Sequence, residues 1–289
     1  MKQLLLLFFV QLFFSEMFSQ TGNTTFGFIS NSKEIIKINK ITKEQVYSYN
    51  FSNSGVKDST LTNTYFYDTS GDLVEEKLAK IKNYDESITK YENSYYPSGK
   101  LHRQIVNKLS LKMVTIYEFE YDSLGNEVNK YDYNEDTTRL TIEQKIYNDK
   151  NQVIQLQTKV NNNDFYVSRK YYYNTNNELS KVDAFDKKGE LIYSYIYEYD
   201  NAQNKKTVYH ENGDGRKKTG EYFYNNDKQC VKINSTFKSP TFISSTSTEY
   251  DSFNQVTENI YNPDKTIFES NVYLDGKKVQ MNRHFYFKE

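Results

Sequence analysis

Residues 171–179 have the sequence YYYNTNNEL and contain the unit that decides the fold. Tyr173 is followed by Asn174, and Asn side chains open turns by hydrogen-bonding to backbone two residues further on. Asn177 is a residue type that tolerates positive φ at low cost. The apolar pattern resumes at Leu179. The stretch therefore predicts a strand, a four- or five-residue hairpin loop and a returning strand.

The same pattern recurs along the chain, and aligning it on the tyrosine before each turn reveals a period of about 26 residues. We call these residues the anchor tyrosines: Tyr67, Tyr96, Tyr121, Tyr147, Tyr173, Tyr199, Tyr224 and Tyr250. Their rings are expected to fill the core. Weaker turn signals half a period later, as at Asp186 and Gly189, indicate a turn about every 13 residues. The sequence predicts an all-β antiparallel meander of tandem hairpin repeats forming one continuous twisted or coiled sheet.

The fourth position after an anchor tyrosine is predicted to adopt positive φ. The residues there are of a suitable type in five repeats: Gly71, Gly125, Asn151, Asn177 and Asn254. Gln203 and Lys228 break this rule. The sixth position is usually apolar, and Cys230 occupies it in its own repeat. As the only cysteine, Cys230 cannot form an intramolecular disulfide.

Residues 1–19 have the features of an export signal. Lys2 precedes an apolar run that extends to Phe14, and Ser19 is a small residue suited to cleavage. The run is too short to cross a bilayer, and no later run approaches about 20 apolar residues. We therefore expect an exported protein, located in the periplasm, on the cell surface or in the medium, with no transmembrane segment in the mature chain.

Residues 20–60 fit the repeat poorly and are interpreted as a divergent N-terminal repeat or cap, whereas residues 61–289 are the tandem repeats. The formal net charge of the chain is -1, and basic and acidic residues are interspersed. A nucleic-acid partner would need a concentrated basic patch, so none is expected.

Several turn sequences resemble those of a known family. YFYDTSGDL at residues 65–73 and EYDSLGN at residues 120–126 are similar to the YD repeats of Rhs-type bacterial surface and toxin proteins. YYPSGKL at residues 95–101 resembles the related MORN-type repeat. The resemblance implies β-hairpins wound into a sheet, in some members a shell around a toxin, and in others carbohydrate binding.

The chemistry of a catalytic or metal site is not evident from the spacing of side chains. His102, His210 and His284 have no metal-ligand or general-base spacing and are interpreted as solvated strand residues. An EF-hand-like pattern between Asp132 and Glu143 has Thr137 where the loop needs glycine, so a chance match is favoured. The glutamates that precede anchor tyrosines are interpreted as a charged solvent face: Glu120, Glu198 and Glu249. We expect a non-enzyme without metal or other cofactor.

Aromatic residues that point away from the anchor face are the candidate ligand-binding residues: Phe66, Tyr95, Tyr172 and Phe223. Exposed rings on a sheet can stack on sugar rings. The sequence thus predicts an exported, non-catalytic binding or structural module of the cell envelope, whose partner is an envelope glycan or protein. The alternatives are a secreted carbohydrate-active hydrolase and an immunity-type partner or shell fragment of a toxin system.

Cleavage of the predicted signal sets the N-terminus of the mature protein. We expect intact-mass measurement of exported material to give a chain that starts at Gln20 or within about two residues of it. A chain that reaches its final location with Met1 retained would contradict the export signal.

Overall fold

The computed structural model describes residues 33–52, 55–80, 85–226, 228–244, 247–274 and 277–288. The predicted export signal and the first part of the predicted cap lie outside these residues. The chain divides into two compact units. Unit 1 comprises residues 1–73, 201–205 and 219–289, and unit 2 comprises residues 74–200 and 206–218.

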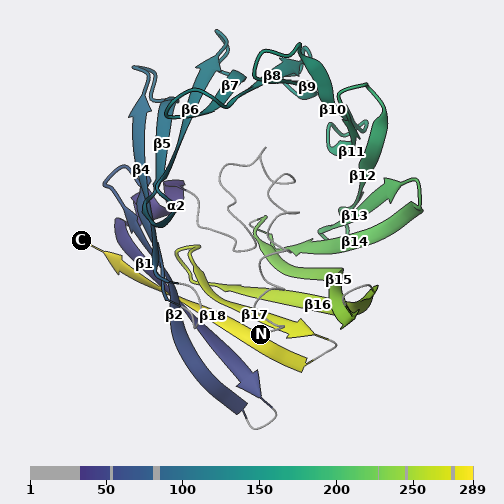
Figure 1. The fold of residues 1–289 in the computed structure, drawn as a ribbon. Coiled ribbons are helices and arrows are strands. Elements are labelled where there is room, and N and C mark those ends of the chain that lie inside the picture. The colour runs from purple at the N-terminus through teal and green to yellow at the C-terminus, as the bar shows by residue number, and fades with distance from the viewer. Residues whose placement is uncertain are drawn as a thin grey trace. The chain divides into compact units, whose positions relative to one another are not determined.

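Unit 1 contains one short helix and the strands near both ends of the chain (Figure 1). Its elements are α2 (Lys33–Ile38), β1 (Ile41–Ser52), β2 (Gly55–Tyr67), β15 (Cys230–Ser244), β16 (Ser247–Tyr261), β17 (Ile267–Leu274) and β18 (Lys277–Lys288). Its buried apolar residues are Ile36, Ile41, Val46, Tyr222, Ile267 and Met281.

Unit 2 contains the strands of the middle of the chain. They are β4 (Ser87–Tyr95), β5 (Leu101–Lys108), β6 (Met113–Tyr121), β7 (Glu127–Asn134), β8 (Leu140–Tyr147), β9 (Val153–Val160), β10 (Tyr166–Tyr173), β11 (Leu179–Phe185) and β12 (Leu191–Asp200), with the 3-10 turn η1 (Leu109–Leu111). Three strands contain residues of both units: β3 (Leu73–Leu78), β13 (Lys205–Asn212) and β14 (Gly215–Tyr224). The buried apolar residues of unit 2 are Val106, Ile116, Leu156, Val182, Ala184, Tyr197 and Val208.

The described residues form 18 strands in one hydrogen-bonded order, each beside the next in the chain. Neighbouring strands run antiparallel, as predicted. The predicted continuous sheet closes on itself, because β1 pairs with β18 as well as with β2. Val46 lies opposite His284 on one side and Asn63 on the other. The strand order is therefore a closed antiparallel meander, the topology of a β-barrel. Closure pairs the backbone N–H and C=O groups that an open edge strand would leave exposed.

The predicted turn chemistry is confirmed in most repeats. The Asn148 Oδ1 atom accepts hydrogen bonds from the backbone N–H groups of Lys150 and Gln152, at 3.0 and 2.9 Å. The residue at the fourth position after the anchor tyrosine has positive φ at Gly71, Gly125, Asn151 and Asn177. Lys228 also adopts positive φ, although its side chain does not favour it.

The prediction of a turn after Tyr250 is wrong, because the strand continues through this position. Tyr250 lies inside β16 opposite Pro240, and Asn254 lies opposite Thr236. The strand ends instead at Tyr261, and Lys265 has positive φ in the turn that follows. β15 and β16 are each 15 residues long, so ladder hydrogen bonds extend past the expected turn.

The anchor tyrosines whose side chains are described are half-buried and not part of the fully buried core. Several of them donate a hydrogen bond from the phenol hydroxyl to a backbone carbonyl in a nearby strand, close to the strand end next to a turn. The pairs with their O–O distances are Tyr96 with Phe119 at 3.0 Å, Tyr147 with Glu127 at 2.7 Å, Tyr173 with Val153 at 2.9 Å and Tyr199 with Leu179 at 2.9 Å. These bonds link consecutive turns along one end of the strands.

The backbone conformation of the turns can be tested at two glycines. Gly125 has φ of +86°, whereas Gly213 is not in the positive-φ region, and a Cβ atom added to it would meet no other atom within 4 Å. We expect Gly125→Val to lower the free energy of unfolding by about 1–2 kcal/mol, because a β-branched residue resists positive φ. Gly213→Val is the matched control and should change it less. Equal urea midpoints for the two variants would contradict this assignment.

Candidate functional site

The candidate ligand-binding rings do not form one site. Phe66, Tyr95, Tyr172 and Phe223 lie on β2, β4, β10 and β14, which are not neighbours in the strand order. Tyr95 and Tyr172 are exposed in unit 2, whereas Phe66 and Phe223 are half-buried in unit 1. Phe66, however, belongs to a larger group of aromatic residues.

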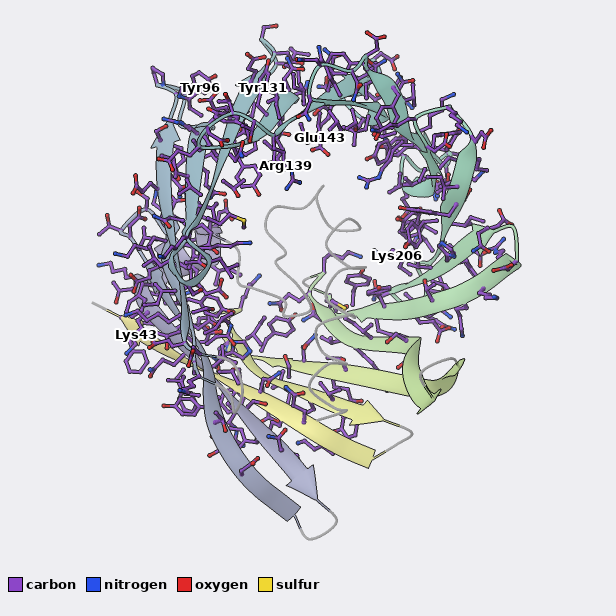
Figure 2. The ribbon with its side chains drawn as sticks, in the orientation of Figure 1. Lys43, Tyr96, Tyr131, Arg139, Glu143 and Lys206 are labelled. Atoms are coloured by element: carbon purple, nitrogen blue, oxygen red, sulfur yellow. The ribbon has the colours of Figure 1, made fainter. Side chains whose placement is uncertain are left out.

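This group lies on one face of β1, β2 and β18, where the register aligns aromatic residues with cations. Lys43 is opposite Phe66 on β2 and opposite Phe287 on β18. Directly opposite residues of neighbouring strands share a face of the sheet, as do alternate residues of one strand. The resulting aromatic–cation surface consists of Lys43, Tyr47, Tyr49, Phe66, Arg283, Phe285 and Phe287. Lys43 projects from this side of unit 1 (Figure 2).

The cations of the aromatic–cation surface lie over its rings. The Lys43 Nζ atom is 4.9 Å from the ring centroid of Phe287 and 5.9 Å from that of Phe66. The Arg283 guanidinium is 5.7 Å from the ring centroid of Tyr49. These distances are within the range of cation–π attraction, which holds the rings in place between the strands.

The charges of the two cations are balanced differently. The Arg283 Nε atom donates a 2.9 Å hydrogen bond to Glu269 Oε2. Burial alone would raise the pKa of Glu269, but hydrogen bonding from Arg283 helps to lower it overall. Lys43 forms no ion pair with a carboxylate among the described residues. Lys43 is thus a half-buried cation that lies over two rings.

Two rings of the surface are open to solvent. Phe285 is 41% exposed and Phe287 is 44% exposed. Phe285 also contacts Tyr47 edge to face, with ring centroids 5.5 Å apart. Contiguous exposed aromatic side chains are unusual on a protein that binds nothing, because their burial against a partner is favourable.

The histidines differ in burial. His102 is exposed and contacts the Tyr96 ring, and His210 is half-buried against Tyr193 and Tyr195. The interpretation of His284 as a solvated residue is wrong, because only 6% of it is exposed. Strand alternation alone could have placed His284 on the face opposite Phe285, but not revealed what covers that face.

The carboxylates considered from the sequence have hydrogen-bond or ion-pair partners within unit 2. Glu120 Oε2 accepts hydrogen bonds from Asn129 and Tyr131, at 2.7 and 3.1 Å. Glu198 pairs with Arg216. The side chain of Glu249 lies outside the described residues. These pairings provide no two carboxylates facing a common space.

The described part of the chain contains no evident metal centre. No three His, Cys, Asp or Glu side chains within it are grouped closely enough to hold a metal ion. In the EF-hand-like pattern, Asn134 and Asp136 accept hydrogen bonds from Arg139 and Thr138 and so close a turn. Among the same residues, no helix is long and apolar enough to cross a membrane.

Comparison with known proteins gives no family. No protein-family model matches the chain, and no curated protein matches it in sequence. A solved structure of a porin-like protein from Bacteroides uniformis matches 86% of this chain and 97% of its own, with 8% identity and a TM-score of 0.43. Structures of TcdB2-TccC3, with and without Cdc42, match 78% of this chain at 12% and 11% identity, each with a TM-score of 0.31. The chain spans 13% and 14% of those two proteins, and likeness at this level transfers no function.

The expected membership of the YD-repeat or MORN-type families is wrong. No family model matches, and the strand order of the described residues closes on itself. The physical reason is that a tyrosine, an Asp or Asn and a positive-φ residue specify a hairpin turn. Any long antiparallel meander needs such turns, so the pattern is not specific to one family.

Measuring the free energy of unfolding can check how exposed the Phe285 and Phe287 rings are. We expect Phe285→Ala and Phe287→Ala each to lower the free energy of unfolding by about 1–2 kcal/mol, since 41% and 44% of these residues are exposed and only part of each ring is buried. Tyr222, which is 2% exposed, is the buried comparison, and Tyr222→Ala should cost about 3–5 kcal/mol. Urea unfolding of the three variants gives these values, and a loss at Phe287 as large as that at Tyr222 would show that the ring is buried.

Proposed function

We propose that this protein is an exported, non-catalytic binding module of the cell envelope that binds a glycan through the aromatic–cation surface of unit 1. The observation that carries the proposal is the placement of Lys43 between Phe66 and Phe287, without a carboxylate partner among the described residues. Export is supported by the signal-like sequence of residues 1–19.

The chemistry of the surface suits a sugar polymer with acidic groups. Aromatic rings offer a flat apolar face to a sugar ring, and the Tyr47 and Tyr49 hydroxyls offer hydrogen bonds at the ring edges. A carboxylate or sulfate on the glycan can pair with the Lys43 ammonium and draw it off the rings, which frees the ring faces for stacking. A neutral protein surface would gain less from an unpaired lysine.

A transmembrane barrel needs an apolar band on the strand face that contacts lipid. The strands β6 to β9 of unit 2 do not support such a band, because both of their faces carry charged residues. On one face the aligned residues are Phe119, Lys130, Glu143 and Thr158, and on the other they are Glu118, Tyr131, Ile142 and Lys159. Figure 2 shows Glu143 and Arg139 on one side of these strands. Charges at the centre of a lipid-exposed face are costly. We therefore propose a location in the aqueous part of the envelope.

A non-enzymatic role is proposed because the recurring glutamates are engaged in hydrogen bonds and ion pairs. A glycosidase of the usual kind needs two carboxyl groups about 5–10 Å apart that flank the sugar bond. Glu120 and Glu198 instead bind the side chains that neighbour them on the sheet. Binding without turnover is the function that remains for an exposed aromatic surface.

The proposal is tested by a binding screen on immobilised acidic and neutral glycans. We expect binding to an acidic glycan that weakens about tenfold or more in Phe287→Ala and in Lys43→Gln, because each removes one part of the proposed contact. Leu191→Ala, at a residue 55% exposed in unit 2, is the matched control and should bind as the parent does.

Tyr172→Ala locates the binding surface, because Tyr172 is the most exposed of the four rings predicted from sequence. Loss of binding in this variant, with binding retained in Phe287→Ala, would place the ligand on unit 2 and refute the proposed surface. Hydrolysis of a bound glycan would refute the non-catalytic proposal.

A further inference from the structure

The hairpin that joins β5 to β6 ends in a turn of unusual composition. Residues 108–113 have the sequence KLSLKM, and η1 forms the turn itself. Lys108 and Met113 are the last opposite pair of the two strands, so residues 109–112 lie beyond the end of their ladder. All of these residues belong to unit 2. We call residues 108–113 the hairpin tip.

Three apolar side chains of the hairpin tip are open to solvent. Leu109 is 43% exposed, Leu111 is 67% exposed and Met113 is 41% exposed. A single exposed leucine is ordinary on a protein surface, but three exposed apolar residues within five positions concentrate apolar area at one place. The turn itself is closed by the backbone, because the Lys112 N–H donates to the Leu109 carbonyl at 3.2 Å.

The hairpin tip is also positively charged. Lys108 and Lys112 flank the two leucines, and neither lysine forms an ion pair among the described residues. Residues 93–117 contain no Asp or Glu, although the chain has 38 acidic residues among its 289. The exposed apolar side chains therefore lie between two cations whose charges no nearby carboxylate in the sequence neutralises.

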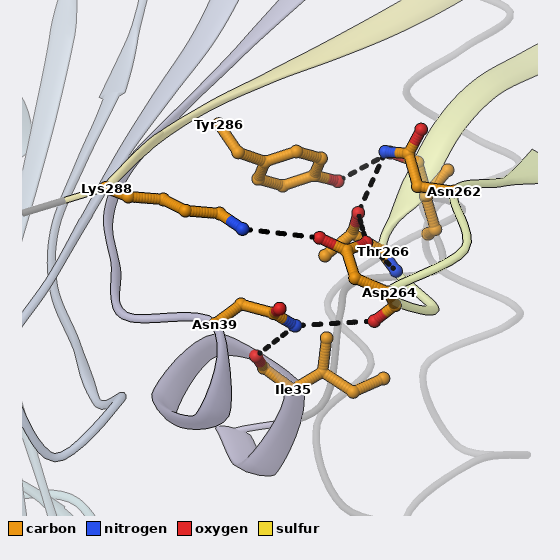
Figure 3. A network of polar contacts seen from close by, with 8 residues as sticks. Ile35, Asn39, Asn262, Asp264, Thr266, Tyr286 and Lys288 are labelled. Carbon is orange, nitrogen blue, oxygen red and sulfur yellow. Dashed lines mark hydrogen bonds and ion pairs between the residues drawn. The ribbon is translucent and has the colours of Figure 1, made fainter.

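Two other turns show how polar groups usually close a turn in this protein. Figure 3 shows the turn between β16 and β17, where the Asn39 amide donates to the Asp264 carbonyl at 3.3 Å and Lys288 Nζ is 3.5 Å from an Asp264 carboxylate oxygen. In the turn between β6 and β7, the Asp122 Oδ1 atom accepts a 2.9 Å hydrogen bond from the Leu124 N–H. The hairpin tip contains no Asp or Asn. Closing the turn therefore does not account for its leucines and lysines.

We infer that the hairpin tip is a contact site for the surface of a phospholipid bilayer that contains anionic lipids. Leucine and methionine side chains gain free energy when they enter the boundary between headgroups and acyl chains. Lysines beside them attract the anionic headgroups. The contact is peripheral, because only the turn meets the bilayer and the strands remain in water. The inference does not rest on the proposed glycan binding, which uses unit 1.

The shape and chemistry of the hairpin tip favour a bilayer over other partners. Its exposed side chains include no aromatic ring, so it lacks the flat faces that stack on sugars. A standard protein interface covers about 800 Å² on each partner, far more than three partly exposed side chains of one turn provide. A bilayer is fluid and needs no surface of matching shape, so one turn is enough for a weak and reversible contact.

The next turn at the same end of the strands limits the extent of the contact. The turn between β7 and β8 carries Glu135 and Asp136, both exposed, and Arg139 offsets only one of these charges. Anionic headgroups repel a turn with net negative charge. The contact is therefore confined to the hairpin tip, and its measurement requires a method that detects weak, reversible binding.

The chain contains no tryptophan, so a single introduced indole reports directly on its own surroundings. We expect the emission of Leu111→Trp to shift to shorter wavelength with vesicles of phosphatidylglycerol and phosphatidylcholine, and to be quenched by bromine-labelled acyl chains. Leu124→Trp is the matched control, because Leu124 is 74% exposed in the turn at the other end of β6. The nine residues of β6 place the two turns about 30 Å apart, so the control emission should not change.

The contribution of the lysines is measured in the Leu111→Trp background. Adding Lys108→Gln and Lys112→Gln should weaken vesicle binding at least about tenfold, and pure phosphatidylcholine should weaken it similarly. Unchanged emission from Leu111→Trp, which a tip made for a protein partner would give, would overturn the inference. An equal shift in Leu124→Trp would also overturn it.

Flotation of the mature protein without an introduced indole covers the case in which tryptophan itself creates the contact. We expect part of the unaltered protein to float with the same anionic vesicles. Leu111→Asp should abolish flotation, because it places a carboxylate at the most exposed position of the hairpin tip, whereas Leu124→Asp should retain it. No flotation of the unaltered protein, or flotation that persists in Leu111→Asp, would overturn the inference.

Discussion

In the turn after β8, the Asn148 side chain accepts two backbone hydrogen bonds while Asn151 adopts positive φ. This short-range arrangement recurs after most even-numbered strands, and it sets the point at which each strand ends. Because side chains alternate between faces, the turn position also decides which residues of the returning strand share a face. The hydroxyl-to-carbonyl bonds of the anchor tyrosines then join one turn to the next. Register along the whole meander depends on this turn.

The register gives β1 and β18 two different faces. One carries Lys43 between aromatic rings, and the other carries the buried pair of Glu44 and His284. A shift by one residue in either strand would exchange the faces, exposing the pair and burying the lysine. The proposed binding surface and the buried pair of Glu44 and His284 are therefore consequences of a single strand alignment.

The sequence predicts part of this site. Phe66 is expected from strand alternation to point away from the anchor face, and it lies in the aromatic–cation surface. Phe285 and Phe287 escape sequence reasoning because the candidate rings are chosen next to anchor tyrosines, and the last anchor tyrosine is Tyr250. The burial of His284 also escapes it, because alternation assigns a residue to a face without saying what packs against that face.

What the sequence by itself determined is the series of turns and strands in the repeats up to Tyr224, since these depend on bonds between residues no more than about five positions apart. The closure of the meander was decided only by the tertiary structure. Glu44 and His284 are 240 residues apart in the chain, and no local pattern near either residue encodes the other. Their meeting requires that the intervening strands all keep their register and return the last strand to the first. The local sequence at each turn specifies where one strand ends and the next begins. Whether the first and last strands then pair is a property of the whole sheet.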